Sequence, residues 1–275
     1  MRTVRTLRTA LVVVFAALLS LLVVGVTVAP SGETAGRTVR STLDGEKVRI
    51  TFPTGEARPK GLAIWFHGQG GNVNDRVDGP FLSALVRHGY ALASSDFHLQ
   101  SWGNEASTAD TLALVEWAEE QAGVPVTLWV SGSMGGSISL NAMRFGAPVP
   151  PCWYGVKPAV SLTQMDRVPT ARKYIAAAYG GEVPVERDPV RNTDGLPVDV
   201  RYRVVASPDD KWVPIDENGG AVASRLAARG AEVTYFLAHG AHNDPSHWDA
   251  TDLVNFANAC AGDEGVVVKS DRASG

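Results

Sequence analysis

Short, mostly apolar runs recur along the chain, and a helical pattern follows most of them. The clearest runs span residues 61–66, 90–94 and 126–130. Runs of this length suit strands that are buried on both faces of a parallel sheet. Segments between them, such as residues 107–122, carry apolar residues at helical spacing and end at a glycine. The alternation predicts an α/β fold with a mostly parallel central sheet and helices on both faces.

The remaining elements follow from the same patterns. Further strands are expected at residues 38–43, 47–52, 156–162, 198–206 and 233–238, and further helices at residues 80–88, 133–145, 219–228 and 250–261. An Asp-Gly turn joins the first two strands as a hairpin. Residues 148–197 hold eight of the 16 prolines. We therefore expect a short excursion there, with one helix at residues 171–179, rather than a large helical lid.

The run at residues 126–130 leads directly into the sequence Ser-Gly-Ser-Met-Gly-Gly at residues 131–136. A strand, a tight turn and a helix around a central serine form a nucleophile elbow, which predicts Ser133 as a nucleophile. The positions two before and two after it must be small, and they are Ser131 and Gly135. A phosphate-binding loop is the alternative, but no lysine follows and the dinucleotide glycine spacing is absent.

A serine nucleophile needs a base, and the base needs an acid that fixes its tautomer. The predicted strand at residues 198–206 is followed by Asp209 and Asp210, and the last strand by His239 and His242. Acid and histidine therefore follow the serine in the chain order that this type of active site uses.

These features together resemble the α/β-hydrolase family across residues 37–262. The resemblance rests on His67-Gly68-Gln69, Ser131-x-Ser133-x-Gly135, the Asp-x-x-Val-Pro stretch that ends at Pro214, and the terminal Gly-x-His. It implies a catalytic triad of Ser133, Asp210 and His242. It also implies an oxyanion hole formed by the backbone amides of Gln69 and Met134.

Several neighbours are alternatives for these roles. Asp209 stands next to the acid, but Asp210 has the family's spacing to Pro214. His239, His242 and His247 could suggest a zinc site, yet no cysteine or further histidine stands nearby, so we expect no metal. The chemistry needs no cofactor. Four tryptophans are expected on loops, and Trp102, Trp212 and Trp248 are predicted to line the substrate pocket; the fourth is Trp153.

The predicted activity is that of a serine hydrolase that cleaves small carboxylic esters. Two alternatives remain open: an oligopeptidase-like peptidase or amidase, and a non-catalytic relative that serves as a binding module. The net charge of −4 and the absence of a basic cluster in the domain argue against a nucleic-acid partner.

The N-terminus predicts export. Three arginines precede an uncharged apolar run at residues 10–29, and a polar, small-residue segment follows. Residues 1–36 are therefore expected to be a signal peptide, or a membrane anchor and linker that leaves the domain outside. Residues 263–275 are expected to be a flexible tail. Cys152 and Cys260 are the 2 cysteines, and the sequence leaves their pairing open.

Overall fold

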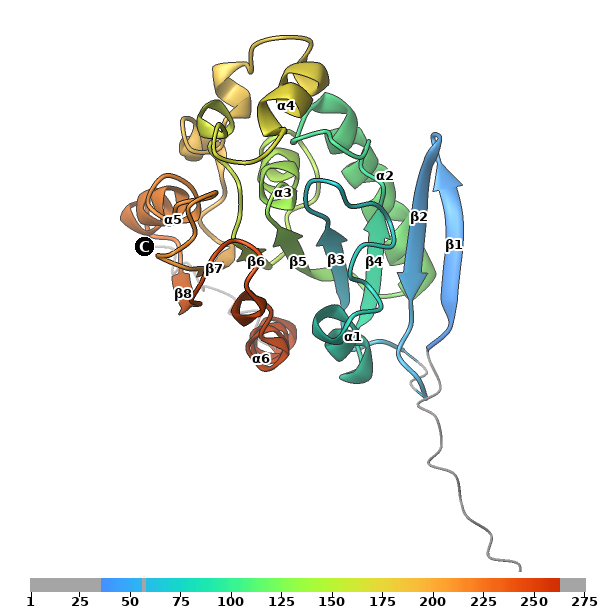
Figure 1. The fold of residues 1–275 in the computed structure, drawn as a ribbon. Helices are drawn as coiled ribbons and strands as arrows, with labels where there is room; N and C mark the ends of the chain where they lie inside the picture. Colours follow the sequence, from blue (N-terminus) through green and yellow to red (C-terminus); the bar gives the residue numbers. More distant parts are fainter. Residues whose placement is uncertain (1–35, 56–57, 263–275) are drawn as a thin grey trace, which may run out of the picture. The chain divides into compact units, whose positions relative to one another are not determined.

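The computed structural model describes residues 36–55 and 58–262 (Figure 1). In these ranges eight strands form one sheet in the order β1-β2-β4-β3-β5-β6-β7-β8. Strand β2 pairs antiparallel with β1 and β4, and the other neighbouring strands are parallel. The strands are β1 Thr38–Leu43, β2 Glu46–Thr51, β3 Leu62–Phe66, β4 Ala91–Ser95, β5 Val126–Gly132, β6 Cys152–Val156, β7 Arg201–Ala206 and β8 Val233–Leu237. The helices are α1 Pro80–Arg87, α2 Glu105–Ala122, α3 Gly135–Arg144, α4 Ala171–Tyr179, α5 Gly219–Ala228 and α6 Ala250–Gly262.

Two apolar clusters fill the space between the sheet and its helices. Leu82 of α1 and Leu253 of α6 belong to one cluster, on one face of the sheet. Leu114 of α2, Ile138 of α3 and Leu226 of α5 belong to the other. Helices α1 and α6 accordingly cover one face, and α2, α3 and α5 the opposite face (Figure 1). The predicted fold class, with helices on both faces of a mostly parallel sheet, is confirmed.

One predicted strand is wrong. The sequence pattern placed a strand at residues 156–162, whereas β6 runs from Cys152 to Val156. Pro158 has no N–H to donate to a neighbouring strand, and Lys157 has a φ of 43°, in the left-handed region. Both features end the strand. The correction also moves Trp153, predicted on a loop, into the middle of β6.

The Pro-rich segment contains one α-helix, α4, at the predicted residues, together with short 3-10 turns. The predicted short excursion without a large helical lid is therefore confirmed. The predicted export segment and C-terminal tail lie outside the described residues, apart from Gly36. No helix within residues 36–55 and 58–262 is long and apolar enough to cross a membrane.

A disulfide bond joins Cys152 at the start of β6 to Cys260 in α6, across 108 residues of chain. It answers the question that the sequence left open. Both cysteines are buried in the cluster beneath α1 and α6. The bond therefore fastens the last helix to the centre of the sheet.

The double substitution Cys152→Ala/Cys260→Ala is expected to destabilise the protein. A closed loop of this length stabilises the fold by ~4–5 kcal/mol when the bond restricts the unfolded chain. Denaturant titration should show the lower free energy of unfolding, and thiol counting on the unfolded wild-type protein should find no free thiol. Two free thiols in the protein from an oxidising compartment would contradict the bond.

Candidate active site

Ser133 lies in the turn between β5 and α3, with a φ of 50°. A non-glycine residue rarely adopts this left-handed conformation, which persists only where the surroundings hold it. The surroundings here require small neighbours. A Cβ atom at Gly135 would lie 2.1 Å from the carbonyl oxygen of Phe66, which no side chain tolerates. The predicted elbow geometry is therefore present.

Ser131 replaces the glycine that often stands two residues before the nucleophile. Its hydroxyl lies 2.8 Å from the hydroxyl of Ser139 on α3. The indole N–H of Trp153 donates to the same Ser139 oxygen, also at 2.8 Å. Since the buried Ser131 hydroxyl has a partner, the substitution leaves no unsatisfied polar group behind the nucleophile.

Three predicted residues from three separate strand ends form one hydrogen-bonded row. The Oγ atom of Ser133 is 3.0 Å from Nε2 of His242. Nδ1 of His242 is 2.6 Å from Oδ2 of Asp210. The other carboxylate oxygen accepts hydrogen bonds from the backbone amides of Trp212 and Val213, at 3.0 and 3.1 Å. All three members of the row are buried.

The surroundings set the charges of this row. Burial alone would raise the pKa of Asp210, but the hydrogen bond from His242 and the two backbone amides outweigh it, so the pKa is lowered. Burial lowers the pKa of His242, and the Asp210 hydrogen bond only partly opposes this. The nearby Lys157 charge lowers it further. His242 is therefore neutral near pH 7, the form that accepts a proton from serine.

The loop after β3 lies against the elbow. A Cβ atom at Gly68 would lie 3.5 Å from Cβ of Ser133, so the next residue, Gln69, stands beside the nucleophile. Within the described residues, the backbone N–H groups of Gln69 and Met134 have no protein acceptor. Two such amides beside a nucleophile are available to an oxyanion, and the oxyanion hole stays a prediction for this pair.

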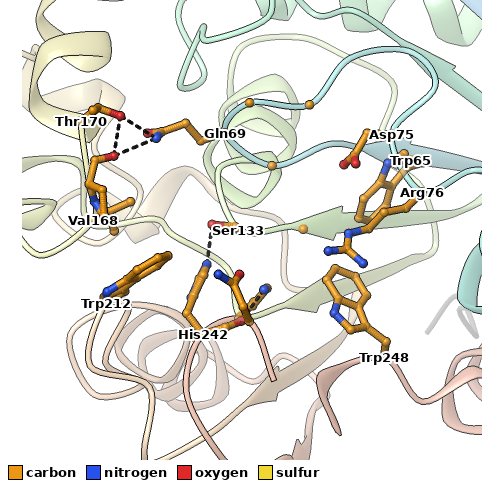
Figure 2. A pocket seen from close by; sticks show the side chains of 17 residues that line it. Trp65, Gln69, Asp75, Arg76, Ser133, Val168, Thr170, Trp212, His242 and Trp248 are labelled. Carbon is orange, nitrogen blue, oxygen red and sulfur yellow. Dashed lines mark hydrogen bonds between the residues drawn. The ribbon is translucent and has the colours of Figure 1, made fainter. Parts of the chain in front are cut away.

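The Gln69 side chain joins this loop to the Pro-rich excursion. Its amide nitrogen donates to the carbonyl oxygen of Pro169 at 2.9 Å and to the hydroxyl of Thr170 at 3.1 Å. Figure 2 shows these bonds on one side of the nucleophile. The excursion therefore forms one wall of the site.

A cavity of about 440 Å³ opens over Ser133 and His242. It has two parts on either side of the nucleophile (Figure 2). The lid-side lobe is lined by Gln69, Val168, Pro169, Thr170 and Trp212. The cationic lobe is lined by Trp65, Asp75, Arg76, Lys157 and Trp248.

Two of the three predicted pocket tryptophans line this cavity. Trp212 lies over His242, with 5.5 Å between ring centroids, and Trp248 lies in the cationic lobe. Trp102 does not line the cavity. It is fully buried in the cluster beneath α2 and α3, so its predicted role in the pocket is wrong. The backbone of Trp102 has a φ of 50°, in the left-handed region.

Lys157 is a cavity residue that the sequence reasoning missed. Its side chain is buried, and its ammonium donates to the backbone carbonyl of His242. The signal was hidden by the misplaced strand, which put Lys157 inside β6 rather than at its end. Ends of parallel strands are where ligand-binding residues gather.

The other histidines and acids near the site have structural contacts. The ring nitrogens of His67 lie 2.9 and 2.8 Å from the carbonyl oxygens of Gly68 and Asp96. His247 is buried, with Nδ1 3.0 Å from the carbonyl oxygen of Asp244. Neither histidine is part of the hydrogen-bonded row of Ser133, His242 and Asp210.

One group in the described part of the chain has the donors for a metal ion. Atoms of Glu46, His98 and Asp110 lie within 4.8 Å of one another. The His98 Nδ1 atom is 2.6 Å from an Asp110 oxygen. Burial opposes a charge on His98, but this hydrogen bond and the negative charges of Asp110 and Glu46 together outweigh it and raise the pKa of His98. An ion pair accounts for the group, and none of its members lines the cavity.

The chain was compared with protein families, curated proteins and solved structures. No protein-family model and no curated protein matches the chain. Among solved structures, an esterase/lipase from an uncultured bacterium is similar with a TM-score of 0.66 and 17% identity, over 84% of this chain and 85% of that one. Esterase B from Lactobacillus rhamnosis, inhibited by a tributyrin phosphonate, is similar with a TM-score of 0.66 and 14% identity, over 83% and 88%.

A larger protein shares the same core. A putative dipeptidyl aminopeptidase IV from Bacteroides ovatus is similar with a TM-score of 0.67 and 11% identity, over 84% of this chain but only 36% of that one. At these identities the likeness concerns the fold. The chain has the α/β-hydrolase fold, as the sequence resemblance implied.

Proposed function

We propose that this protein is a serine hydrolase that cleaves carboxylic esters through an acyl-enzyme. The observation that carries the proposal is the continuous row from Ser133 through His242 to Asp210, with both hydrogen bonds formed. The strained conformation of Ser133 and the lowered pKa of His242 support it.

In this mechanism His242 accepts the Ser133 proton at Nε2 while the serine oxygen attacks the ester carbonyl carbon. Asp210 holds the other ring nitrogen protonated and stabilises the imidazolium. The amides of Gln69 and Met134 stabilise the negative oxygen, each by ~3 kcal/mol or more. His242 then protonates the departing alcohol. In the second half a water molecule loses a proton to His242 as its oxygen attacks the acyl carbon. The bond between that carbon and the Ser133 oxygen then breaks, His242 returns the proton to Ser133, and the carboxylic acid leaves.

The structural neighbours bear on the choice between ester and peptide substrates. Chains similar over nearly their whole length include named esterases. Named peptidases with the same core are much longer, and this chain covers 36% and 40% of two of them. Peptide hydrolysis is therefore the second candidate, and esters are favoured.

Short and medium acyl esters are expected to be cleaved faster than long-chain esters, by about tenfold or more in kcat/KM. The reason is the lid-side lobe, whose wall is a short loop followed by the nine-residue helix α4. That helix offers no long apolar face to cover an extended chain. Measuring kcat/KM for p-nitrophenyl esters with acyl chains of about two to sixteen carbons tests this preference.

Peptide p-nitroanilides provide the comparison for the second candidate. A clear preference for them over esters would favour a peptidase. An optimum at long acyl chains would contradict the open lid-side lobe. Absence of turnover in the whole panel, together with no fluorophosphonate labelling, would favour a binding module.

We also propose that the domain is exported. The basic and apolar N-terminal segment supports this, and so does the Cys152–Cys260 bond, because such bonds persist mainly in oxidising compartments. Mass analysis of the protein recovered outside the cell distinguishes a cleaved signal from a retained anchor. A domain accessible only in the cytoplasm would contradict export.

A further inference from the structure

The cationic lobe of the cavity holds charged groups that the hydrolytic mechanism does not use. Arg76 comes from the loop after β3, and Lys157 follows β6. Both approach the same indole ring: the guanidinium carbon of Arg76 is 4.1 Å from the Trp248 ring centroid, and Nζ of Lys157 is 5.1 Å from it. Figure 2 shows Arg76 and Trp248 facing one another on the side of Ser133 opposite the lid-side lobe.

Arg76 has no anionic partner in the described ranges. Its guanidinium stacks on Trp248, but none of its five N–H donors reaches a protein acceptor there. Arg49 and Arg203, by contrast, are paired with Asp78 and Asp252. The Arg76 backbone has a φ of 58°, in the left-handed region, and its carbonyl accepts a hydrogen bond from Gly79 at 2.8 Å. A turn thus holds the Arg76 backbone in a conformation that arginine rarely adopts, and this places the side chain at the cavity.

Lys157 is also incompletely paired. Its ammonium has three donors, and in the part of the chain that the structure describes only the carbonyl of His242 accepts one. Burial, with the nearby Arg76 charge, lowers the pKa of Lys157 to about 8. A buried ammonium beside a guanidinium is unfavourable unless an anion compensates it.

Asp75 is the remaining charged group of the lobe, and it lies close enough to favour the charged form of Lys157. Its carboxylate balances one of the two cations. Asp210 is also ionised and favours the charged form of Lys157, so these four charges nearly cancel. The Asp210 oxygens, however, are already bound by His242 and by the backbone amides of Trp212 and Val213. The lobe therefore keeps cationic N–H donors, on Arg76 and Lys157, that no anion among the described residues binds. A carboxylate suits it, because its two oxygens match the planar fork of a guanidinium.

We propose that the cationic lobe binds a free carboxylate of the substrate, so that the preferred substrates are esters that carry one negative charge, such as half-esters of dicarboxylic acids. The proposal rests on the proposed ester hydrolysis at Ser133. Arg76 and Lys157 hold the carboxylate, and Trp65 and Trp248 contact the adjoining carbon chain.

Matched pairs of esters test this preference. The mono-p-nitrophenyl ester of glutaric acid is compared with p-nitrophenyl valerate, which has the same acyl length without the charge. The 4-acetoxybenzoate anion is compared with its methyl ester, which tests a charge on the alcohol side. The wild-type protein should prefer the anion in at least one pair, and the preference should decline with added salt.

Substitutions in the cationic lobe test whether its residues cause the preference for anionic esters. Arg76→Gln should reduce the ratio of kcat/KM for the anionic and neutral esters by about ten- to a hundredfold, because hydrogen bonds to a charged group are lost. Asp75→Asn should raise the ratio. Arg40→Gln removes an exposed charge on β1, outside the cavity, and should leave the ratio of kcat/KM unchanged. The arginine variants share the same change in net charge.

A binding measurement separates this proposal from the proposed function. In calorimetry, glutarate should bind to the Ser133→Ala variant. It should bind more weakly to the double variant Ser133→Ala/Arg76→Gln. Neutral-ester turnover with no charge preference and no Arg76-dependent glutarate binding overturns the carboxylate site and leaves ester hydrolysis standing. Arg76-dependent glutarate binding by a protein that cleaves no ester supports the carboxylate site and contradicts ester hydrolysis.

Discussion

Ser133→Ala is expected to reduce ester hydrolysis by roughly 10⁴- to 10⁶-fold in kcat, the range seen when a triad loses its nucleophile. The substitution removes only the Oγ atom, which His242 faces at 3.0 Å. The amides of Gln69 and Met134 remain, so some catalysis above the rate in water persists. Initial rates with a short p-nitrophenyl ester measure the loss.

The fold of this variant should be unchanged. Alanine keeps the Cβ atom and places no new group in the crowded turn, where Gly135 approaches Phe66 closely. Thermal unfolding and circular dichroism provide the control. His242→Ala should cost about as much as Ser133→Ala, because the triad acts as a unit. A folded Ser133→Ala protein with wild-type turnover would exclude Ser133 as the nucleophile.

Asp210→Asn is expected to lower kcat by ~10⁴. The asparagine oxygen still accepts the backbone amides of Trp212 and Val213, so the turn should keep its structure. Its NH₂ group, however, donates towards Nδ1 of His242. This favours the imidazole tautomer with the proton on Nε2, which has no lone pair for the Ser133 hydroxyl. Steady-state kinetics with the same short ester measure the loss.

Asp209→Asn is the matched control, since Asp209 is the exposed neighbour in the same turn. Its effect on kcat should be small. His247→Ala is the control for the base, because His247 is buried beside the site but bonds only to the Asp244 carbonyl in the described part of the chain. A severe loss in Asp209→Asn or His247→Ala, with mild effects at Asp210 and His242, would reassign the triad.

Most of the fold was predictable because the buried strands carry their signal locally. Residues 62–66 and 126–132 lie in the middle of the sheet and are apolar or small throughout. Their length and their composition therefore both predict strands that are buried on both faces. The strand ends were predictable where a glycine or a turn follows at once. The wrong strand at residues 156–162 had an apolar composition, but proline and the left-handed Lys157 interrupt it.

The candidate triad could be predicted because each member lies in a recognisable turn that follows a strand. Pocket residues could be predicted less well, since their positions depend on how loops pack. Trp102 and Trp212 both lie on loops, yet one is fully buried in the core and the other is 37% exposed at the cavity. Arg76 carried no sequence signal, because its proposed role depends on two distant segments, the loop after β3 and the end of β6, that meet at Trp248.

The most direct test of the central claim is labelling of the wild-type protein with a fluorophosphonate, followed by mass spectrometry of its peptides. Such a probe phosphonylates a serine only where a base and an oxyanion hole activate it. The proposed mechanism predicts one adduct on Ser133, lost in Ser133→Ala and strongly reduced in His242→Ala. An unlabelled protein, or an adduct on another serine that persists in Ser133→Ala, would contradict it.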